Sequence, residues 1–341
     1  MIQNQDQKSN LPMAPIVDSH GRVHRSLRIS VTDRCNIRCF YCMPENVKFL
    51  PQDSILNFEE IHRVVQILAR QGVSRVRLTG GEPLVRSEIW NLVELVKSVP
   101  GINEVALTTN GILLSDQAKK LKSSGLDRIN VSLDSIDPEK FKEITRRDAL
   151  DKVLAGIDAA VQAGFDNIRI NAVSVKGISE TEVLPLVSWA QQQNLHLRFI
   201  EFMPLDGDQA WQNQQVFTGA RLRSIIEANF GSLTPVRRGH ASQPATDFQL
   251  SDGSAPIGFI DSVTEPFCQT CDRMRITAEG KLRNCLFSTQ EWDLKDLIRS
   301  NASDAQIEER IRLGIQHKKL GHGSDSGRFV RPDRAMYQIG G

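Results

Sequence analysis

Short runs of β-branched and aliphatic residues recur along the chain, and a turn signal and a helical apolar pattern follow each run. The runs predict strands over residues 27–31, 75–78, 104–108, 128–133, 167–173 and 197–202. Helix starts are indicated by Asn57 with Glu60, by Ser179 with Glu182 and by Asp137 before a proline. Strands that alternate with helices predict parallel βαβ units.

Six units are two short of a closed eight-stranded barrel. We therefore predict an α/β fold in which residues 22–235 form an incomplete (β/α)6 TIM-like barrel. From residue 236 to residue 341 the pattern changes to strands and hairpins, which predicts a smaller α+β region that covers the open side. Residues 1–21 are polar and contain two prolines, so they are predicted to form an N-terminal tail.

Composition and charge narrow the classes of function. The chain has 341 residues, of which 40% are hydrophobic and 24% charged, as in ordinary globular proteins. Its formal net charge of +1 supplies no global field for nucleic acid or for an anionic membrane. No apolar leader and no membrane-spanning run stand out in the sequence. We expect a cytoplasmic protein that binds any anionic substrate locally, with neither nucleic acid nor membrane as a partner.

The six cysteines fall into two sets of three, which indicates metal or redox ligands rather than disulfides. Cys35, Cys39 and Cys42 follow the first predicted strand with the spacing C-x-x-x-C-x-x-C. Three thiolates on a cubane cluster leave one of the four irons open to a small molecule. Structural zinc is the alternative, but it needs a fourth ligand, and the next Cys or His is His62.

The second set comprises Cys268, Cys271 and Cys285, and a turn at residues 278–280 predicts a hairpin that returns Cys285 to the other two. The C-terminal region is thereby predicted to carry a second cluster. Zinc completed by a downstream histidine, His317 or His322, remains an alternative here. Arg273 and Arg275 share one strand face, where they either solvate the strand or clamp a phosphate.

The first cysteine motif, with the aromatic Tyr41 before its last cysteine, resembles that of the radical S-adenosylmethionine superfamily. The Gly-Gly-Glu-Pro segment at residues 80–83, after the second predicted strand, adds to this likeness. The resemblance implies that S-adenosylmethionine chelates the open iron of a 4Fe-4S cluster. One electron then cleaves it to methionine and a 5'-deoxyadenosyl radical.

The pattern F-C-x-x-C-x-R-x-R-x-T, the third cysteine on the return strand and the terminal Gly340-Gly341 resemble the GTP 3',8-cyclase family of molybdenum cofactor biosynthesis. The resemblance extends over residues 22–341. It implies two 4Fe-4S clusters, the second of which binds the guanine of GTP. It further implies that the adenosyl radical removes the ribose 3' hydrogen and that C3' then adds to C8 of guanine.

The resemblance also implies roles for individual positions. Catalytic roles fall on Cys35, Cys39, Cys42, Arg273, Arg275, Gly340 and Gly341, with the Gly-Gly tail entering the barrel mouth. S-adenosylmethionine contacts fall on Tyr41, Gly81, Glu82, Ser132 and Met203. GTP contacts fall on Arg28, Arg77, Thr108, Arg169, Arg273, Met274 and Arg275. Arg169 departs from the lysine usual in the family, and a guanidinium has a different geometry from an ammonium.

The implied partners are a one-electron reductant of the flavodoxin or ferredoxin type, the next enzyme of the pathway (cyclic pyranopterin monophosphate synthase) and a second copy in a homodimer. Two rival functions remain open. A peptide-modifying radical S-adenosylmethionine enzyme usually carries more C-terminal cysteines than this chain has. A noncatalytic electron-transfer protein would ligate both clusters fully, whereas each set here stops at three.

Overall fold

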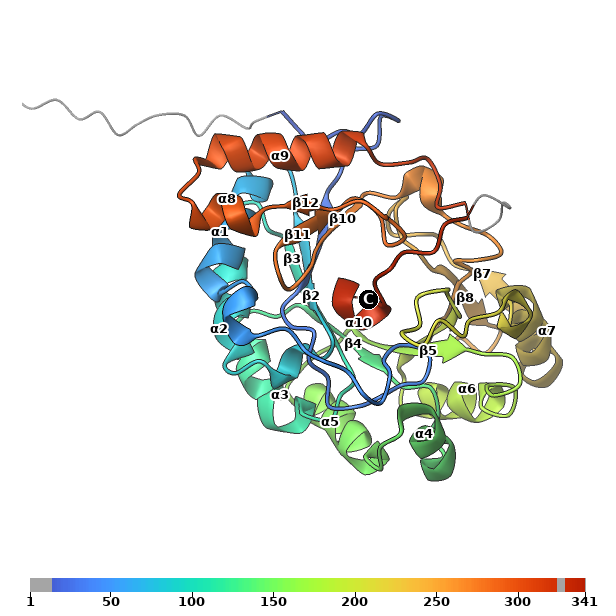
Figure 1. Ribbon diagram of the computed structural model, residues 1–341. Coiled ribbons are helices and arrows are strands. Elements are labelled where there is room, and N and C mark those ends of the chain that lie inside the picture. Colours follow the sequence, from blue (N-terminus) through green and yellow to red (C-terminus); the bar gives the residue numbers. More distant parts are fainter. Residues whose placement is uncertain (1–13, 324–328, 341) are drawn as a thin grey trace, which may run out of the picture.

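The computed structural model describes residues 14–323 and 329–340 and has an α/β fold built on one mixed sheet (Figure 1). Its strands are β1 (Ser26–Ser30), β2 (Arg75–Thr79), β3 (Glu104–Thr109), β4 (Arg128–Ser132), β5 (Ile168–Ser174), β6 (His196–Glu201), β7 (Leu233–Pro235), β8 (Thr246–Leu250), β9 (Ile257–Ile260), β10 (Arg273–Ile276), β11 (Lys281–Arg283) and β12 (Trp292–Asp293). The spatial order is β12-β11-β10-β1-β2-β3-β4-β5-β6-β9-β8-β7.

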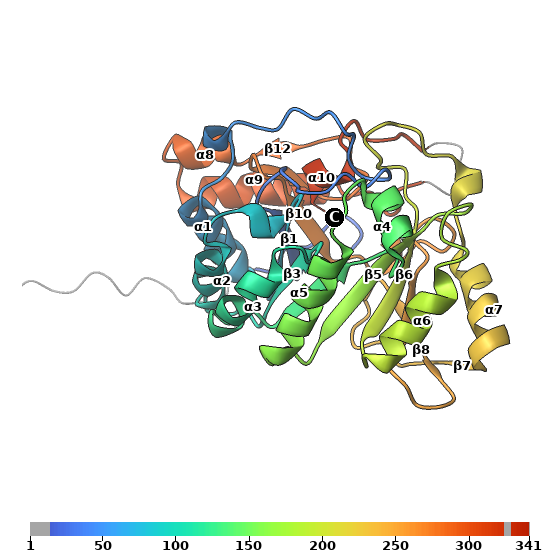
Figure 2. The same cartoon turned by 90° about the horizontal axis from the view of Figure 1, so that it is seen from below.

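The helices are α1 (Phe58–Ala69), α2 (Ile89–Lys97), α3 (Leu114–Ser123), α4 (Pro138–Thr145), α5 (Leu150–Gln162), α6 (Val183–Gln192), α7 (Gly219–Phe230), α8 (Lys295–Arg299), α9 (Asp304–Gln316) and α10 (Met336–Ile339). Figures 1 and 2 show α1, α2, α3, α5 and α6 along the outside of the curved sheet, with α10 on its inside.

All six predicted strands are confirmed as β1 to β6, which pair in parallel in chain order. Two predicted helix starts are also confirmed. Asn57 and Glu60 form a reciprocal capping box on α1, and Asp137 caps α4 with Pro138 at its first position. The βα alternation therefore forms where the local pattern placed it.

The predicted start at Ser179 is wrong, because α6 begins only at Val183. The Ser179 hydroxyl accepts a hydrogen bond from the amide of Val175 and closes a turn directly after β5. Glu182 instead accepts a hydrogen bond from the Ser135 hydroxyl. Tertiary bonds thus occupy both members of the expected capping pair.

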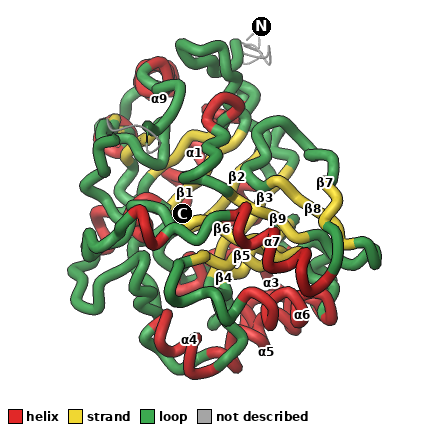
Figure 3. The backbone as a smooth tube through the Cα atoms, turned by 90° about the vertical axis from the view of Figure 1, so that its right-hand side faces the viewer, coloured by secondary structure: helices red, strands yellow, loops and turns green. Residues whose placement is uncertain are grey.

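The region after residue 235 does not build a sheet of its own. β9 pairs in parallel with β6, and β10 pairs in parallel with β1, so this region extends the central sheet at both edges. Figure 3 shows β7, β8 and β9 beside β6. The backbone groups of β1 and β6, which would otherwise lie at the edges, are paired in this way.

Part of the predicted N-terminal tail contacts the fold: among residues 14–21, Ile16 and Asp18 are buried and the other six are exposed, while residues 1–13 lie outside the described part. Ile16 is 1% exposed and belongs to the main hydrophobic core. Asp18 is ion-paired with Arg22 at 2.7 Å and contacts His24 at 3.1 Å. Among the described helices, none has the length and apolar character needed to cross a membrane.

Candidate active site

A cavity of about 480 Å3 lies on the inner face of the sheet. Most of the positions predicted to bind ligands line it, although they come from distant parts of the sequence. They are Arg28, Cys35, Cys39, Tyr41, Cys42, Arg77, Gly81, Thr108, Ser132, Arg169, Met203, Arg273 and Arg275. The fold therefore gathers the first cysteine triad and the arginines of β10 around one space.

The loop that carries the first triad is held against the Gly-Gly turn. The amide of Gly81 donates to the carbonyl oxygen of Thr32 at 2.7 Å, and the amide of Glu82 donates to that of Arg34 at 2.7 Å. A Cβ atom at Gly81 would lie 2.4 Å from the carbonyl oxygen of Arg34. Only glycine permits this approach of two backbone segments.

Glu82 does not line the cavity, in contrast to its predicted contact with S-adenosylmethionine. Its carboxylate is 1% exposed and accepts hydrogen bonds from Thr109 Oγ1, the Asn110 amide and the Leu84 amide. Burial raises its pKa to about 7. Glu82 therefore joins the Gly-Gly turn to the end of β3.

In the first triad Cys39 is buried and Cys35 and Cys42 are half-buried, and the three thiols carry no disulfide. Burial raises the pKa of Cys35 to about 11 and that of Cys42 to about 12. Asn110 Nδ2 donates to Cys35 Sγ at 3.7 Å, and Tyr41 donates to the Asp134 carboxylate at 2.6 Å. Because metal ligation requires thiolates, cluster insertion here must release protons.

The second triad lies at the two ends of the β10–β11 hairpin, and its cysteines do not line the main cavity. Cys271 Sγ accepts hydrogen bonds from Arg273 Nε at 3.3 Å and from Lys318 Nζ at 3.5 Å. Burial opposes its charged form, but Arg273 and Lys318 lower the pKa of Cys271 to about 6. Arg22 donates to the carbonyl oxygen of Cys268 at 2.7 Å. Sequence reasoning missed Arg22 and Lys318, because nothing local links either to the triad.

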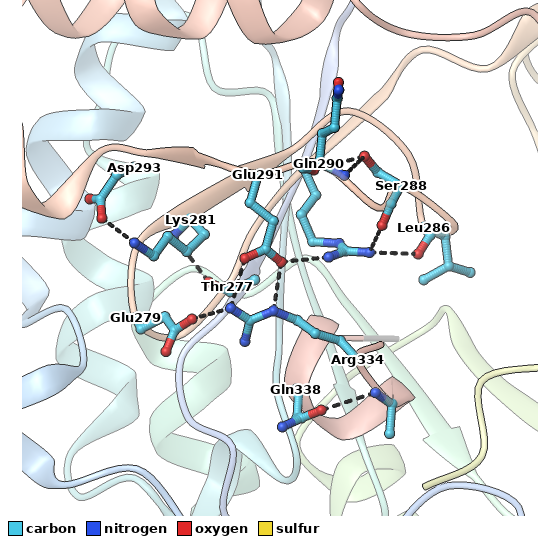
Figure 4. Close-up of polar contacts among 12 residues, drawn as sticks. Thr277, Glu279, Lys281, Leu286, Ser288, Gln290, Glu291, Asp293, Arg334 and Gln338 are labelled. Carbon is cyan, nitrogen blue, oxygen red and sulfur yellow. Dashed lines mark hydrogen bonds and ion pairs between the residues drawn. The ribbon is translucent and has the colours of Figure 1, made fainter. Parts of the chain in front are cut away.

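An ion-pair network fixes the segment that carries Cys285 (Figure 4). Arg334 pairs with Glu291 at 2.6 Å and also with Glu279, while Arg283 pairs with Glu291 at 2.5 Å. Arg283 is only 2% exposed, so the carboxylate of Glu291 compensates a buried positive charge. The network fastens Arg334, two residues before α10, to the hairpin of the second triad.

The short helix α10 contacts both triads. Tyr337 packs with Cys35 and Cys42 in one apolar cluster, and its amide donates to Cys42 Sγ. Ile339 packs with Cys285 in another cluster. The C-terminal segment therefore lies between the two sets of cysteines, and Figure 1 shows α10 near the centre of the fold.

Arginines occupy one row across the inner face of the sheet. Arg275, Arg28 and Arg77 are paired in register on β10, β1 and β2. Burial and the neighbouring Arg275 hold the pKa of Arg28 well below its usual range, and burial and Arg28 do the same for Arg77. Neither Arg28 nor Arg77 forms an ion pair with a carboxylate in the described ranges. This row is suited to an anionic ligand, which would restore the missing countercharge.

Three further arginines in the cavity were missed: Arg75, Arg128 and Arg198. Arg75 stands two residues before Arg77 on β2, so the same-face argument used for β10 would have found it. Each of the three pairs with a carboxylate, namely Asp272, Glu104 and Asp247 respectively. They extend the positive lining towards the N-terminal ends of the strands.

Two other predicted substrate residues differ in placement. Arg169 lines the cavity, and its buried Nε has no hydrogen-bond partner, which favours ligand contact over a solvated strand. Met274 is fully buried in the hydrophobic core on the opposite face of β10. Its side chain does not reach the cavity, which leaves only its backbone for a contact. Gly341 lies outside the described residues.

Of the two histidines considered for zinc at the second triad, His322 lies beside it, because its backbone amide donates to Cys268 Sγ. His317 is exposed and its Nδ1 contacts the carbonyl oxygen of Leu313 at 2.8 Å. Among residues 14–323 and 329–340, no three Cys, His, Asp or Glu side chains surround one point as ligands of a single ion do. A cubane cluster presents a separate iron to each thiolate, so three cysteine donors fit it without such convergence.

The fold and the first triad define the class of protein, and comparison with known families agrees. The model of the Radical SAM superfamily matches residues 29–190, and that of Molybdenum Cofactor Synthesis C matches residues 195–324. Streptococcus suis SuiB, solved bound to S-adenosylmethionine, has a similar fold, with a TM-score of 0.63, 16% identity and coverage of 90% of this chain and 76% of SuiB. The chain is thus a radical S-adenosylmethionine protein, and this superfamily uses a 4Fe-4S cluster with S-adenosylmethionine.

Closer relatives give the particular family. The chain is 48% identical to the GTP 3',8-cyclase of Rhodopirellula baltica, with 96% of this chain and 92% of the relative covered. It is 42% identical to that of Streptomyces coelicolor, with 96% of each covered. The chain belongs to the GTP 3',8-cyclase family.

Proposed function

We propose that this protein converts GTP to (8S)-3',8-cyclo-7,8-dihydroguanosine 5'-triphosphate, the first step of molybdenum cofactor biosynthesis. One observation carries the proposal: a single cavity is lined both by the first cysteine triad and by Arg28 and Arg77, which form no ion pair with a carboxylate in the described part of the chain. The triad supports radical chemistry on S-adenosylmethionine, and the arginines support a triphosphate substrate. Membership of the GTP 3',8-cyclase family agrees with both.

We further infer that β1 to β6 and their helices form the incomplete (β/α)6 barrel, over residues 22–235. Residues 236–341 then cover its open side. The sequential parallel order of the six strands supports this interpretation, as does the pairing of β9 and β10 with the two outermost of them. The cavity would be the interior of that barrel.

The first triad would hold the catalytic cluster, with Tyr41, Gly81, Ser132 and Met203 around S-adenosylmethionine. When bound, this cluster supplies the electron that cleaves S-adenosylmethionine to methionine and a 5'-deoxyadenosyl radical. Cys268, Cys271 and Cys285 would hold a second 4Fe-4S cluster, which would bind the guanine of GTP.

Arg28, Arg77, Arg273 and Arg275, with Arg169 and Thr108, would bind and orient GTP. With the cofactor bound, the adenosyl radical would remove the ribose 3' hydrogen to give 5'-deoxyadenosine, and C3' would then form a bond to C8 of guanine. One electron and one proton then complete the 7,8-dihydro product. These residues would contribute by placing C3' of GTP close to the adenosyl radical and to C8 of guanine.

The remaining parts of the proposal concern partners and location. A flavodoxin or ferredoxin would supply the electrons, and cyclic pyranopterin monophosphate synthase would receive the product. We also propose a homodimer in the cytoplasm. These rest on family membership alone.

The test is incubation of anaerobically reconstituted protein with S-adenosylmethionine, dithionite and each nucleoside triphosphate in turn. We expect 5'-deoxyadenosine and the cyclised nucleotide in equal amounts with GTP only. Equal 5'-deoxyadenosine with all four nucleotides, and no cyclised product, would contradict the proposal.

A further inference from the structure

Lys318, two residues beyond α9, is a buried lysine beside the second triad. Lys318 is 3% exposed, and its Nζ lies 2.6 Å from the carbonyl oxygen of Arg273. The same Nζ lies 3.5 Å from Cys271 Sγ. No carboxylate forms an ion pair with it in the part of the chain that is described. Because a buried ammonium is costly unless it is paired, the thiolate of Cys271 is its natural counterion.

The two triads differ in the charges around them. Glu82 contributes repulsion to the Cys35 thiolate, and Asp134 does so for Cys39. The neutral amide of Asn110 is the side-chain donor to Cys35. Cys271, in contrast, receives two cationic donors on one sulfur, from Arg273 and Lys318.

We propose that Lys318 is a positioning residue that holds Cys271 as a ligand and raises the reduction potential of the cluster on the second triad. This rests on the proposed function, which places a cluster there. Reduction adds one negative charge to a cluster, and a nearby cation stabilises that charge. Hydrogen bonds to cysteine sulfur act in the same direction.

The bond to the carbonyl oxygen of Arg273 gives Lys318 its fixed position. It anchors the ammonium to the first residue of β10, two residues from Cys271, so the charge stays at the sulfur. Arg273 also faces the substrate cavity, whereas Lys318 does not line it. Lys318 therefore offers a way to change the charge at the second cluster without removing a predicted GTP contact.

The test is a redox titration of the anaerobically reconstituted full chain, followed by electron paramagnetic resonance. We expect two one-electron waves in the wild type, and addition of S-adenosylmethionine identifies the wave of the first cluster by perturbing it. Lys318→Met should shift the other wave to a more negative potential and leave the first in place. Lys319→Met is the matched control, because Lys319 is the exposed neighbour, and it should move neither wave.

Two more variants keep the proposal testable. Lys318→Arg should hold the second wave nearer to the wild type than Lys318→Met does, because it keeps the charge. If Lys318→Met does not assemble the second cluster, Lys318→Gln retains a neutral donor and should still show the negative shift. The inference would be overturned if the second wave did not shift in Lys318→Met or Lys318→Gln. It would also be overturned if Lys318→Arg shifted that wave as much as Lys318→Met does. About four irons and one wave in the wild type would instead refute the second cluster itself.

Discussion

Arg275 on β10 donates a hydrogen bond to the carbonyl oxygen of Gly340, at the end of α10. Gly340 has a φ of +81°, and a Cβ there would lie 2.9 Å from Thr79 Cγ2 and 3.0 Å from Ser30 Cβ. The end of the described chain is therefore seated on the C-terminal ends of β1 and β2. Arg275, which was predicted to clamp the substrate, thus contacts Gly340 of the predicted Gly-Gly tail directly.

We predict that deletion of Gly340 and Gly341 leaves both clusters and the fold intact but strongly reduces GTP-dependent 5'-deoxyadenosine formation. The deletion removes the hydrogen-bond acceptor of Arg275, a predicted GTP contact. Iron content and circular dichroism provide the structural control. Full cyclase activity in the truncated protein would show that the tail only fills space.

Alanine substitutions in the two triads should have different effects. Wild-type protein should approach about eight irons per chain, because each cubane cluster holds four. Cys39→Ala should abolish cleavage of S-adenosylmethionine. Cys271→Ala should leave some uncoupled cleavage and stop cyclisation. Mössbauer spectroscopy and 5'-deoxyadenosine assays measure both, and stoichiometric zinc in the native second triad would contradict the assignment.

Arg28→Ala should weaken GTP binding by about 1.5–3 kcal/mol, the range for charge-assisted hydrogen bonds. It should not lower the thermal midpoint of the unliganded protein, because Arg28 lies beside Arg275 and Arg77, and no carboxylate among the described residues forms an ion pair with it. Calorimetric binding and thermal unfolding measure the two effects. Arg25→Ala, at an exposed position just before β1, should change neither. Equal losses of binding and stability would indicate a structural role.

Gly81→Ala should destabilise the loop of the first triad. The new Cβ would approach the carbonyl oxygens of Arg34 and Asp33 to 2.4 and 2.6 Å, and neither backbone segment can yield without breaking its hydrogen bonds. We expect a loss of about 1–3 kcal/mol in the free energy of unfolding and reduced iron in the first cluster. Gly321→Ala is the control, since a Cβ there meets nothing within 4 Å.

Stability should fall below neutral pH because of His24. Burial, with the charge of Lys318 added, lowers the pKa of His24 from 6.5 to about 4. The unfolded chain therefore binds more protons between these values, so unfolding becomes easier as the pH falls through that window. Between about pH 7.5 and about pH 5.5 this costs on the order of 1.4 kcal/mol. Urea unfolding of wild type and His24→Gln should show a smaller pH effect in the variant, and equal slopes would contradict the assignment.

Local features of the sequence were enough to predict the central strands and both cysteine triads. Each strand is a short apolar run bounded by turn signals, and each triad has characteristic spacing. The roles of Glu82 and Met274 could not be predicted in the same way. Their motif positions agree with ligand contact. Tertiary hydrogen bonds, however, hold the carboxylate of Glu82 inside the fold, and the alternation of side chains along β10 places Met274 in the core.

Long-range contacts were beyond the reach of pattern reasoning. Nothing near Lys318 or Arg22 in the sequence indicates cysteine neighbours, because those contacts exist only after the chain has folded. The addition of β9 and β10 to opposite edges of one sheet was missed for the same reason. A separate covering region and an extended sheet have the same strand pattern in sequence.

The pairing of β1 with β10 has a consequence for how the chain folds during synthesis. Ser26 and Asp272, which are hydrogen-bonded beside this pair of strands, are 246 positions apart. While the ribosome makes the intervening residues, β1 has an unpaired outer edge that is open to other chains. The edge can be protected only when most of the protein has emerged, so a chaperone that shields the nascent first strand should increase the yield of native enzyme more than one that acts on the finished chain.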